Sequence, residues 1–389
     1  MIRLLADENI AGLDALPPSS VSVSTLPGRS IQAHSLDGID ALWVRSVTQV
    51  DKNLLSKARV SYVGTATAGL EHIDRDYLES TGTHFCAAPG SNANAVVEYV
   101  LAALLELGKP WQTLEQGERL GIVGYGHVGK RLKSVADNLG WRVSLYDPPV
   151  AAEVAAGVAA KGEESPAFCS LDELLSCAVI SVHCSLTHGV AHPSFRLFDE
   201  NVWSCLDAHQ TLINASRGEV FDWSALRQHL ATDSPANLVL DVWENEPGID
   251  ATVLQASAVK IATPHIAGYS LDAKLEATRM LWEGMGNVGM VPPIPLSFDQ
   301  SSEPQPNEQI APTQSASELI QRYYRIRDDD QEMRSRLLEP HSDVGPAFDS
   351  LRRNYPLRRE LAKLEASLFD RHRPSSLAGE ALRLCEALQ

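Results

Sequence analysis

The fold is decided by one stretch, Leu120-Gly121-Ile122-Val123-Gly124-Tyr125-Gly126-His127-Val128-Gly129. Its first four residues are typical of a buried strand, and residues 130–139, which follow it, have a helical pattern. Glycines spaced G-x-G-x-x-G allow a tight turn, close approach of the backbone to a pyrophosphate, and close contact between helix and strand. The helix N-terminus adds amide donors and the positive end of a dipole. Gly124, Gly126 and Gly129 therefore predict a dinucleotide site.

The residues after this motif support that prediction, because a lone glycine motif is weak evidence. The next expected strand, Arg142–Tyr146, ends in Asp147, 18 residues after Gly129. An acid near this spacing binds the hydroxyls of the adenosine ribose. The same carboxylate would repel a 2′-phosphate, and Pro148 and Pro149 stand where a compensating arginine would be needed. We therefore expect NAD rather than NADP as the cofactor.

Expected strands and helices alternate over roughly the first 270 residues, a pattern typical of parallel sheets with crossover helices. The two longest helical patterns are Asn94–Leu107 and Leu271–Met285. The expected strands are Arg3–Leu5, Ala41–Arg45, Tyr62–Gly64, Arg119–Val123, Arg142–Tyr146, Val179–His183, Thr211–Asn214, Leu238–Val242 and Val259–Ala262.

The pattern changes after this region. Residues 291–313 hold six prolines among Ser, Gln and Asn, a composition typical of a linker. The tail from Ser315 to Gln389 is rich in Arg and Leu and is expected to be helical, as in Glu318–Ile326 and Arg358–Phe369. We interpret it as a separate small domain.

Composition limits the classes of partner. The 389 residues are 44% hydrophobic and 21% charged, which is typical of a soluble globular protein with two or three domains. The formal net charge of -17 disfavours nucleic acid and anionic membrane as partners, because both would repel the chain. An anionic substrate must therefore be bound by local arginines.

Cysteine usage and apolar runs indicate the compartment. The six cysteines contain no C-x-x-C pair, so neither a zinc site nor a disulfide framework is expected, and we predict no metal. The N-terminus carries Asp7 and Glu8 and does not resemble a signal peptide. The longest apolar run, Ala95–Leu107, is too short to span a bilayer and contains Glu98 and Glu106. We expect a cytoplasmic protein.

Three residues downstream of the motif form a candidate catalytic set: Arg217, Glu246 and His265. Each follows an expected strand, and in a parallel sheet the strand ends meet at the carboxyl edge, where ligands bind. Taken singly, each has an ordinary interpretation, as a surface ion pair, a loop residue and a structural histidine respectively. Their occurrence together, beside a nucleotide motif, favours a catalytic role.

The chemistry that these residue types support is oxidation of an alcohol. Hydride transfer to nicotinamide leaves a hydroxyl proton, and His265 has a pKa range suited to removing it. Glu246 can hydrogen-bond the other ring nitrogen and stabilise the imidazolium that forms. Arg217 can bind a substrate carboxylate with two parallel bonds, which lysine cannot.

This set resembles that of the D-isomer-specific 2-hydroxyacid dehydrogenases, the family of formate, glycerate and D-3-phosphoglycerate dehydrogenases. The resemblance covers residues 1–290. It implies an α/β fold of two doubly wound, Rossmann-like parallel-sheet domains that share a cleft. Residues 1–92 and 269–290 would form the catalytic domain, and residues 93–268 the NAD-binding domain. Residues 291–389 would form the linker and a small α+β domain through which a homodimer assembles.

Further segments resemble a branch of this family that oxidises a small phosphorylated hydroxy acid, 4-phospho-D-erythronate, to (R)-3-hydroxy-2-oxo-4-phosphooxybutanoate in pyridoxine 5′-phosphate biosynthesis. The segments are Leu4–Ile10, Val44–Thr48, Val63–Asp74, Ala88–Asn94 and Phe348–Pro356.

This resemblance assigns further contacts. Ser46, Thr67 and Tyr269 would bind substrate. His127 and Val128 would lie near the pyrophosphate, and the remaining NAD contacts would come from Asp147, Cys184, Asp241 and Gly268. Cys184 departs from the pattern, because a small hydroxyl residue such as threonine is expected there, and a thiol is a weaker hydrogen-bond partner.

Two anion sites are hypotheses from the residues. The amides of Ala68, Gly69 and Leu70 follow a strand and could cradle the substrate carboxylate, the alternative being an ordinary turn. The terminal phosphate needs a basic partner, for which Arg45 is the first candidate. Arg352 or Arg353 from a partner subunit is the second, the alternative being solvated tail arginines.

Two other functions stay open at this point. The first is a different D-2-hydroxyacid dehydrogenase, such as D-3-phosphoglycerate dehydrogenase, because one Arg–Glu–His set serves many hydroxy acids. The second is a non-catalytic NAD sensor, since a fold alone does not prove chemistry.

Overall fold

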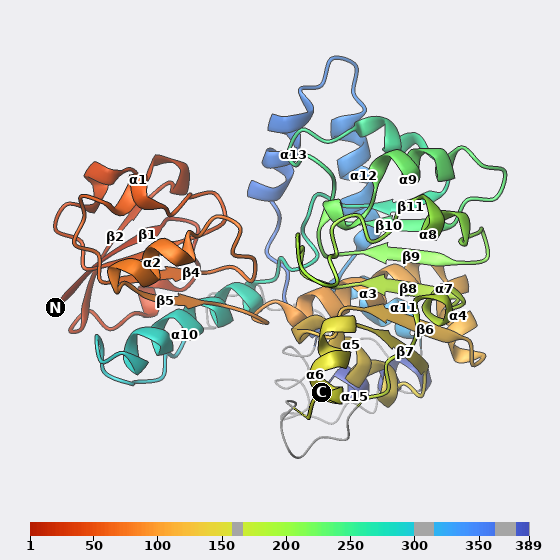
Figure 1. The fold of residues 1–389 in the computed structure, drawn as a ribbon, viewed down its shortest axis with the longest axis horizontal. Coiled ribbons are helices and arrows are strands. Elements are labelled where there is room, and N and C mark those ends of the chain that lie inside the picture. The colour runs from red at the N-terminus through yellow and green to blue at the C-terminus, as the bar shows by residue number, and fades with distance from the viewer. Residues whose placement is uncertain (158–165, 299–314, 362–378, 389) are drawn as a thin grey trace. The chain divides into compact units, whose positions relative to one another are not determined.

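The computed structural model describes residues 1–157, 166–298, 315–361 and 379–388 (Figure 1). The chain divides into two compact units. Unit 1 comprises Met1–Asn92 and Tyr269–Gln309, and unit 2 comprises Ala93–Gly268 and Ile310–Gln389. Most of the expected linker, and most of the expected helix Arg358–Phe369, lie outside the described residues.

Unit 1 contains a parallel sheet with strand order β2-β1-β3-β4-β5 in its described residues. This order, with a switch of direction beside the first strand, is that of a doubly wound sheet. The strands are β1 (Ile2–Asp7), β2 (Val21–Leu26), β3 (Ala41–Val44), β4 (Tyr62–Thr65) and β5 (His84–Ala87). The helices are η1 (Leu13–Ala15), η2 (Gly28–Ser30), η3 (Ala33–Leu36), α1 (Lys52–Leu55), α2 (Arg75–Thr81) and α10 (Leu271–Asn287).

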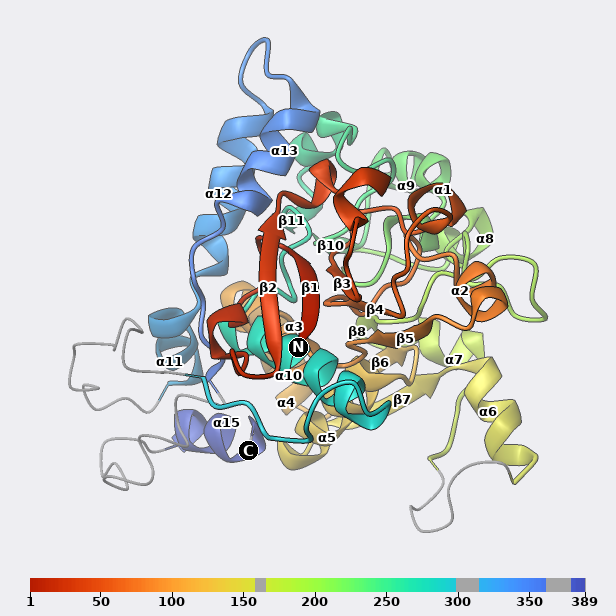
Figure 2. The same ribbon diagram turned by 90° about the vertical axis from the view of Figure 1, so that its left-hand side faces the viewer.

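Both faces of this sheet are buried, because neighbouring residues of each strand enter different cores. Leu4 and Trp43 belong to a core that includes Leu281 and Trp282 of α10. Leu5 and its neighbours enter the other core, on the side of α1 and α2. Helix α10, from the second piece of the unit, contacts β4 and β5 (Figure 2). The N-terminal sheet is therefore completed by residues that follow the first piece of unit 2, Ala93–Gly268, in the sequence.

Unit 2 contains a second parallel sheet, with order β11-β10-β9-β8-β6-β7. The strands are β6 (Arg119–Val123), β7 (Arg142–Tyr146), β8 (Val179–Val182), β9 (Thr211–Asn214), β10 (Asn237–Leu240) and β11 (Val259–Ala262). The helices of this sheet region are α3 (Ala93–Leu107), α4 (Lys109–Glu115), α5 (His127–Asn138), α6 (Pro148–Ala155), α7 (Leu171–Leu175), α8 (Glu200–Ser204), η4 (Gly218–Val220), α9 (Trp223–Leu230) and η5 (Ala251–Gln255).

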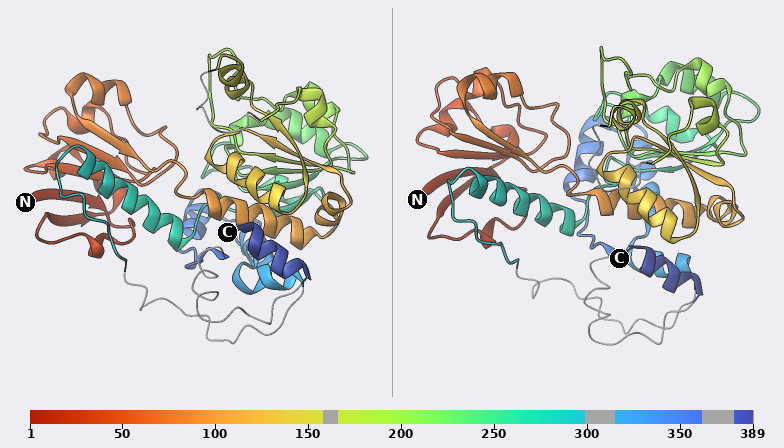
Figure 3. Two further views of the ribbon diagram at one scale, coloured as in Figure 1. Left: turned by 90° about the horizontal axis from the view of Figure 1, so that it is seen from below. Right: turned by 60° about the horizontal axis from the view of Figure 1, so that its bottom comes forward.

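Helices cover both faces of this sheet as well. Figure 3 shows α3 and α5, which pack against each other, on one face, and α8 and α9 on the opposite face. Leu174, Trp203 and Leu226, from α7, α8 and α9, share one core with Ile180 and Leu212 of the strands. The helices cover the faces of the sheet, so loops surround the carboxyl ends of the strands, where ligands bind in such sheets.

The C-terminal tail groups with unit 2. Its described helices are α11 (Ala316–Tyr323), α12 (Ile326–Leu337), α13 (Val344–Arg353) and α15 (Gly379–Leu388). Helix α12 packs against β11 and α13, α11 packs against α3, and α15 packs against α5 and α11. Met333 and Leu337 of α12 and Phe348 of α13 enter the main core of unit 2.

The predicted fold class, with two doubly wound parallel sheets, is confirmed, and several details are corrected. Strands β2 and β5 were not expected. The expected helix Glu318–Ile326 is interrupted, because α11 ends at Tyr323 and α12 begins at Ile326. The described part of the tail contains helices and no strand, so the α+β description of this domain has no strand to support it there. No helix among the described residues has the length and apolarity to cross a bilayer.

Candidate active site

The three glycines of the motif have three different environments. Gly124 follows β6 with a φ of 90°, and a Cβ there would lie 2.6 Å from the Cys184 backbone. At Gly129 a Cβ would lie 2.0 Å from the carbonyl oxygen of Gly124, so helix α5 can contact the turn only without one. At Gly126 a Cβ would meet nothing within 4 Å. The backbone of Gly126 thus faces open space, as the approach of a pyrophosphate requires.

Helix α5 begins at His127, and no side chain caps its N-cap residue Gly126. The first amides of a helix have no acceptor within the helix. Those of His127, Val128 and Gly129 can therefore donate hydrogen bonds to phosphate oxygens. The observed turn therefore offers amide donors and open space where a dinucleotide pyrophosphate would bind.

A pocket of about 520 Å³ extends from this turn and is lined by residues at the carboxyl ends of β6, β7 and β8. Strand β6 lies between β7 and β8, which is the point where the strand order reverses. Asp147 lines the pocket, and its carboxylate accepts hydrogen bonds from the amides of Tyr125 (2.7 Å) and Val150 (3.1 Å). These bonds fix the carboxylate at the pocket wall.

His183 and Cys184, at the end of β8, line the same pocket. Nε2 of His183 lies 2.8 Å from Oγ of Ser181, while its Nδ1 is buried without a hydrogen-bond partner in the described residues. Burial lowers the pKa of His183 to about 3, so its ring is neutral near pH 7. Burial raises the pKa of Cys184 to about 12, so this residue stays a thiol. The pocket wall is uncharged here.

His265 and Glu246 form a hydrogen-bonded pair. Nδ1 of His265 donates to Oε2 of Glu246 over 2.7 Å, and Oε1 of Glu246 accepts from the amide of Trp243 over 2.9 Å. Burial raises the pKa of Glu246, but the charge and hydrogen bond of His265, with the charge of Arg352, lower it below its usual value. The glutamate is therefore ionised, and Nε2 of His265 is left as the basic nitrogen.

The loop that carries His265 follows β11 and is held by Asp241. The Asp241 carboxylate, 1% exposed, accepts from Thr263 Oγ1 (2.6 Å) and from the amides of Ile266 (2.8 Å) and Ala267 (2.9 Å). Burial raises the pKa of Asp241 more than His265 and these hydrogen bonds lower it. His265 itself has a φ of 57°, which is uncommon for a non-glycine residue, and the hydrogen bonds to Asp241 hold the backbone of its loop in place.

Arg217 follows β9 and leads into η4, and Gly268 ends the His265 loop. One Arg217 nitrogen, Nη1, donates to the carbonyl oxygen of Ser216 over 2.8 Å, and Asn214 Nδ2 donates to the Arg217 carbonyl oxygen over 3.1 Å. Arg217, Glu246 and His265 thus lie after three adjacent strands, β9, β10 and β11. The structure brings His265 and Glu246 into direct contact.

Four of the expected substrate residues belong to unit 1. Ser46 is exposed after β3, and Thr67, after β4, donates from its hydroxyl to the carbonyl oxygen of Gly69 over 2.8 Å. In the described part of the chain, the amides of residues 68–70 donate to no protein acceptor. They are thus available for the anion that we expected at this turn.

Tyr269 and Arg45 are neighbours of a residue that the sequence analysis missed, Lys274 of α10. Nζ of Lys274 lies 5.3 Å from the centroid of the Tyr269 ring. Burial, and secondarily the charge of Arg45, lower the pKa of Lys274. Among the described residues, neither Arg45 nor Lys274 forms an ion pair with a carboxylate. The sequence did contain a signal for Lys274, because it is a lysine near the start of an expected helix and five residues after the expected substrate residue Tyr269.

Arg352 and Arg353, considered above as ligands from a partner subunit, lie at the end of α13. Arg353 is exposed, and the charge of Arg352 acts on Glu246 of the same chain. No sequence pattern indicated this effect of charge, because the two residues lie 106 positions apart (246 to 352).

Comparison with known proteins agrees with this geometry. Residues 108–267 match the model of the D-isomer specific 2-hydroxyacid dehydrogenase NAD binding domain. Residues 299–378 match a domain of unknown function. The first match covers all of the glycine motif and the candidate catalytic residues. The expected cofactor, NAD, is confirmed by it.

Relatives cover nearly the whole chain. The erythronate-4-phosphate dehydrogenase of Azotobacter vinelandii is 41% identical over 98% of this chain and 97% of its own length. The chain belongs to the erythronate-4-phosphate dehydrogenase family. Another member, from Stutzerimonas stutzeri, is 40% identical over 92% of this chain and 93% of its own. The protein is accordingly an NAD-dependent dehydrogenase.

Solved structures show the fold that this erythronate-4-phosphate dehydrogenase family member shares with more distant proteins. A D-lactate dehydrogenase from Aquifex aeolicus, complexed with NAD and lactic acid, has a TM-score of 0.57 and 22% identity, covering 74% of this chain and 95% of its own. The TT0316 protein of Thermus thermophilus has a TM-score of 0.60 and 22% identity, covering 76% of this chain and 100% of its own.

Proposed function

We propose that the protein oxidises 4-phospho-D-erythronate at C2 to (R)-3-hydroxy-2-oxo-4-phosphooxybutanoate, with NAD as the hydride acceptor. The observation that carries the proposal is the His265–Glu246 pair, which places a basic nitrogen beside a sheet that matches an NAD-binding family. The substrate follows from the names of the relatives. We infer that the reaction is a step of pyridoxine 5′-phosphate biosynthesis, and we expect it to take place in the cytoplasm.

In this proposal each residue of the set has one task. His265 Nε2 takes the proton of the C2 hydroxyl, while the C2 hydrogen leaves with its electron pair. NAD, when bound, supplies the acceptor for that hydride. Glu246 keeps the Nδ1 proton in place and stabilises the imidazolium. Arg217 binds the substrate carboxylate and polarises the C2 oxygen.

The substrate's other groups need partners from unit 1. Ser46, Thr67 and Tyr269 would bind its hydroxyls and carboxylate, together with the amides of residues 68–70. Arg45 and Lys274 would bind the 4-phosphate. The charge of Arg45 lowers the pKa of Lys274, and neither residue has a carboxylate partner among the described residues, an arrangement that favours a dianion.

The C-terminal tail would pair two copies into a homodimer. The support is the resemblance of Phe348–Pro356 to the corresponding segment of the family, and the match of residues 299–378 to a separate domain model.

The experiment is NADH formation with a panel of hydroxy acids. We expect kcat/KM for 4-phospho-D-erythronate to exceed that for unphosphorylated erythronate by at least about 100-fold, because erythronate leaves the two cations unpaired. It should also exceed that for D-3-phosphoglycerate, whose chain is one carbon shorter and carries its phosphate closer to C2. Arg45→Ala and Lys274→Ala should raise KM much more for the phosphorylated acid than for erythronate. Lys57→Ala, at an exposed lysine of the same unit, is the control. Equal activity on all three acids would refute the proposed substrate, and equal effects on both erythronates would refute the phosphate site.

A further inference from the structure

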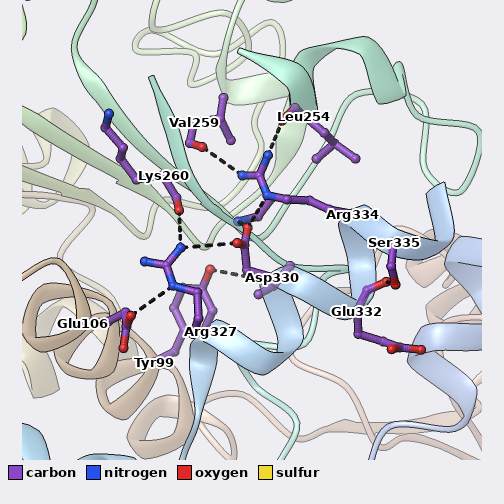
Figure 4. Close-up of polar contacts among 12 residues, drawn as sticks. Tyr99, Glu106, Leu254, Val259, Lys260, Arg327, Asp330, Glu332, Arg334 and Ser335 are labelled. Atoms are coloured by element: carbon purple, nitrogen blue, oxygen red, sulfur yellow. Dashed lines mark hydrogen bonds and ion pairs between the residues drawn. The ribbon is translucent and has the colours of Figure 1, made fainter. Parts of the chain in front are cut away.

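Strand β11, which leads to His265, is an edge strand of its sheet. An edge strand has amide and carbonyl groups with no strand to pair with, and such an edge is normally protected. Here the side chains of α12 occupy that position (Figure 4). Asp330 Oδ1 accepts from the amide of Ala262 (2.8 Å), Arg327 Nη1 donates to the Lys260 carbonyl oxygen (3.0 Å), and Arg334 Nη2 donates to that of Val259 (2.8 Å).

Asp330 connects these contacts. It is 3% exposed, and its carboxylate also accepts from Arg334 Nε over 2.8 Å and from Arg327 Nη1 over 3.4 Å. Arg327 reaches on to Glu106 of α3 over 3.0 Å. Figure 4 shows Glu332 and its helical turn pointing away from the strand. The buried side of α12 thus replaces a missing strand with one carboxylate and two guanidinium groups.

The contact made by Asp330 is close to the chemistry along the chain. Ala262 is the last residue of β11, and His265 follows three positions later. The far side of the same loop is also held by the tail. Arg358, 5% exposed, donates to the carbonyl oxygen of Ala267 over 2.9 Å, while its guanidinium lies 3.8 Å from the Glu98 carboxylate and 4.2 Å from the centroid of the Tyr324 ring. Tail contacts therefore flank His265 on both sides in the sequence.

We propose that the C-terminal tail is part of the catalytic apparatus of its own chain, because Asp330 and Arg358 hold the loop 262–267 and so fix the position of His265. Both are positioning residues, since they act on the imidazole through the backbone. This inference rests on the proposed function, in which His265 is the base, and it goes beyond the role of the tail in pairing two chains.

A positioning role differs measurably from a contribution to stability alone. The pocket beside the glycine motif lies at the carboxyl ends of β6, β7 and β8, and β11 is the edge strand at the opposite end of the strand order. Loosening β11 therefore leaves this pocket intact. The reacting nitrogen, in contrast, depends on the loop, and a displacement of about 1 Å costs roughly 100-fold in rate. Loss of Asp330 should therefore reduce kcat by a much larger factor than it raises the Kd of NAD.

The test compares Asp330→Ala with Asp330→Asn, with Arg336→Ala as the matched control. Asparagine keeps an oxygen that can accept from the Ala262 amide, whereas alanine does not. Arg336 forms an exposed ion pair with Glu332 on the same helix, with 61% and 53% of the two side chains exposed. We expect a loss of kcat of about 10- to 100-fold in Asp330→Ala. Asp330→Asn should lose less than Asp330→Ala, because its oxygen still accepts from the Ala262 amide although its NH₂ group faces Arg327. Arg336→Ala should stay within about threefold of the unchanged protein.

Amide hydrogen exchange gives a second readout that does not depend on turnover. Exchange at residues 262–267 should become at least tenfold faster in Asp330→Ala and in Arg358→Met, while the amides of β6 keep their protection. If Asp330→Ala does not fold, Arg327→Ala, at the more exposed rim of the same network, takes its place.

The outcomes are distinct. Unchanged kcat and unchanged exchange in folded Asp330→Ala would overturn the inference, as would an equal loss in Asp330→Asn and Asp330→Ala. If the unchanged protein does not oxidise 4-phospho-D-erythronate, the proposed function fails instead. The exchange data then still decide whether the tail holds the loop.

Discussion

The substitution Glu246→Gln tests the arrangement around His265 most sharply. The two oxygens of Glu246 accept from two donors, Nδ1 of His265 and the amide of Trp243. A glutamine side chain has only one oxygen to offer. If that oxygen faces His265, the glutamine NH₂ group points at the Trp243 amide, and two donors meet. The buried amide would then lack an acceptor, which costs about 1–3 kcal/mol.

The glutamine will therefore turn its oxygen to Trp243 and its NH₂ group to His265. Nδ1 of His265 must then accept a hydrogen bond, and the ring proton moves to Nε2, the nitrogen that should act as base. Returning to the active tautomer costs the same ~1–3 kcal/mol. Loss of the charge-assisted bond to the imidazolium adds about 1.5–3 kcal/mol. At about 1.4 kcal/mol for each factor of ten, the sum predicts a decrease in kcat of roughly 10²- to 10⁴-fold.

The assay is steady-state NADH formation, with the Kd of NAD measured by fluorescence. The tautomer of His265 can be read from its ¹⁵N chemical shifts, which should report Nδ1 as unprotonated in the variant. Glu244→Gln, at a neighbouring carboxylate outside this pair, is the control and should change kcat less than threefold. A folded Glu246→Gln protein with kcat within threefold of the unchanged enzyme would refute the reasoning, because the pair would then be dispensable.

Other predictions follow from the NAD pocket. Asp147→Ala should weaken NAD binding at least tenfold and reduce the preference for NAD over NADP, since the carboxylate at the pocket wall is lost; an unchanged ratio of the two Kd values would contradict this. The depressed pKa of His183 means that the unfolded chain binds a proton that the folded chain does not, so stability falls as pH drops from about 6.5 towards 3. Between pH 6.5 and 5 this amounts to about 2 kcal/mol in the free energy of unfolding. His183→Gln should reduce that slope in urea denaturation, leaving the smaller part due to the lowered pKa values of His72 and His229, whereas His209→Gln, at an exposed histidine, should retain the full slope.

The sequence predicted the parts of the molecule that depend on local pattern. The central strands of both sheets are mostly apolar, and Gly129 is required by its contact with the Gly124 carbonyl oxygen five positions earlier. The missed strands, β2 and β5, are both edges of the unit 1 sheet. Val21–Leu26 alternates Val with Ser and is mostly exposed, and His84–Ala87 is only partly buried. An edge strand buries less of its surface, so its hydrophobic signal is weak.

The tail contacts were not predictable, because they reverse ordinary preferences. Arginine is rarely buried, so nothing in the sequence indicated that Arg358 enters the interior. Glu98 lies among apolar residues of α3, and a carboxylate there is explained by the Arg358 guanidinium, which lies 3.8 Å from it. The sequence did identify Arg217, Glu246 and His265 as candidates, because each of them follows an expected strand. It could not indicate that the charge of Arg352 acts on Glu246 or that the charge of Arg45 acts on Lys274.

The division of unit 1 into two pieces has a consequence for how the protein is made. When the ribosome has released residues 1–92, the sheet β1–β5 is present, but Leu281 and Trp282 of α10, which share a core with Leu4 and Trp43, are not yet synthesised. One apolar face must therefore stay uncovered while about two hundred further residues are added, at 5–20 residues per second. During those tens of seconds the nascent chain depends on chaperones or on the early folding of unit 2 to keep that face from aggregating.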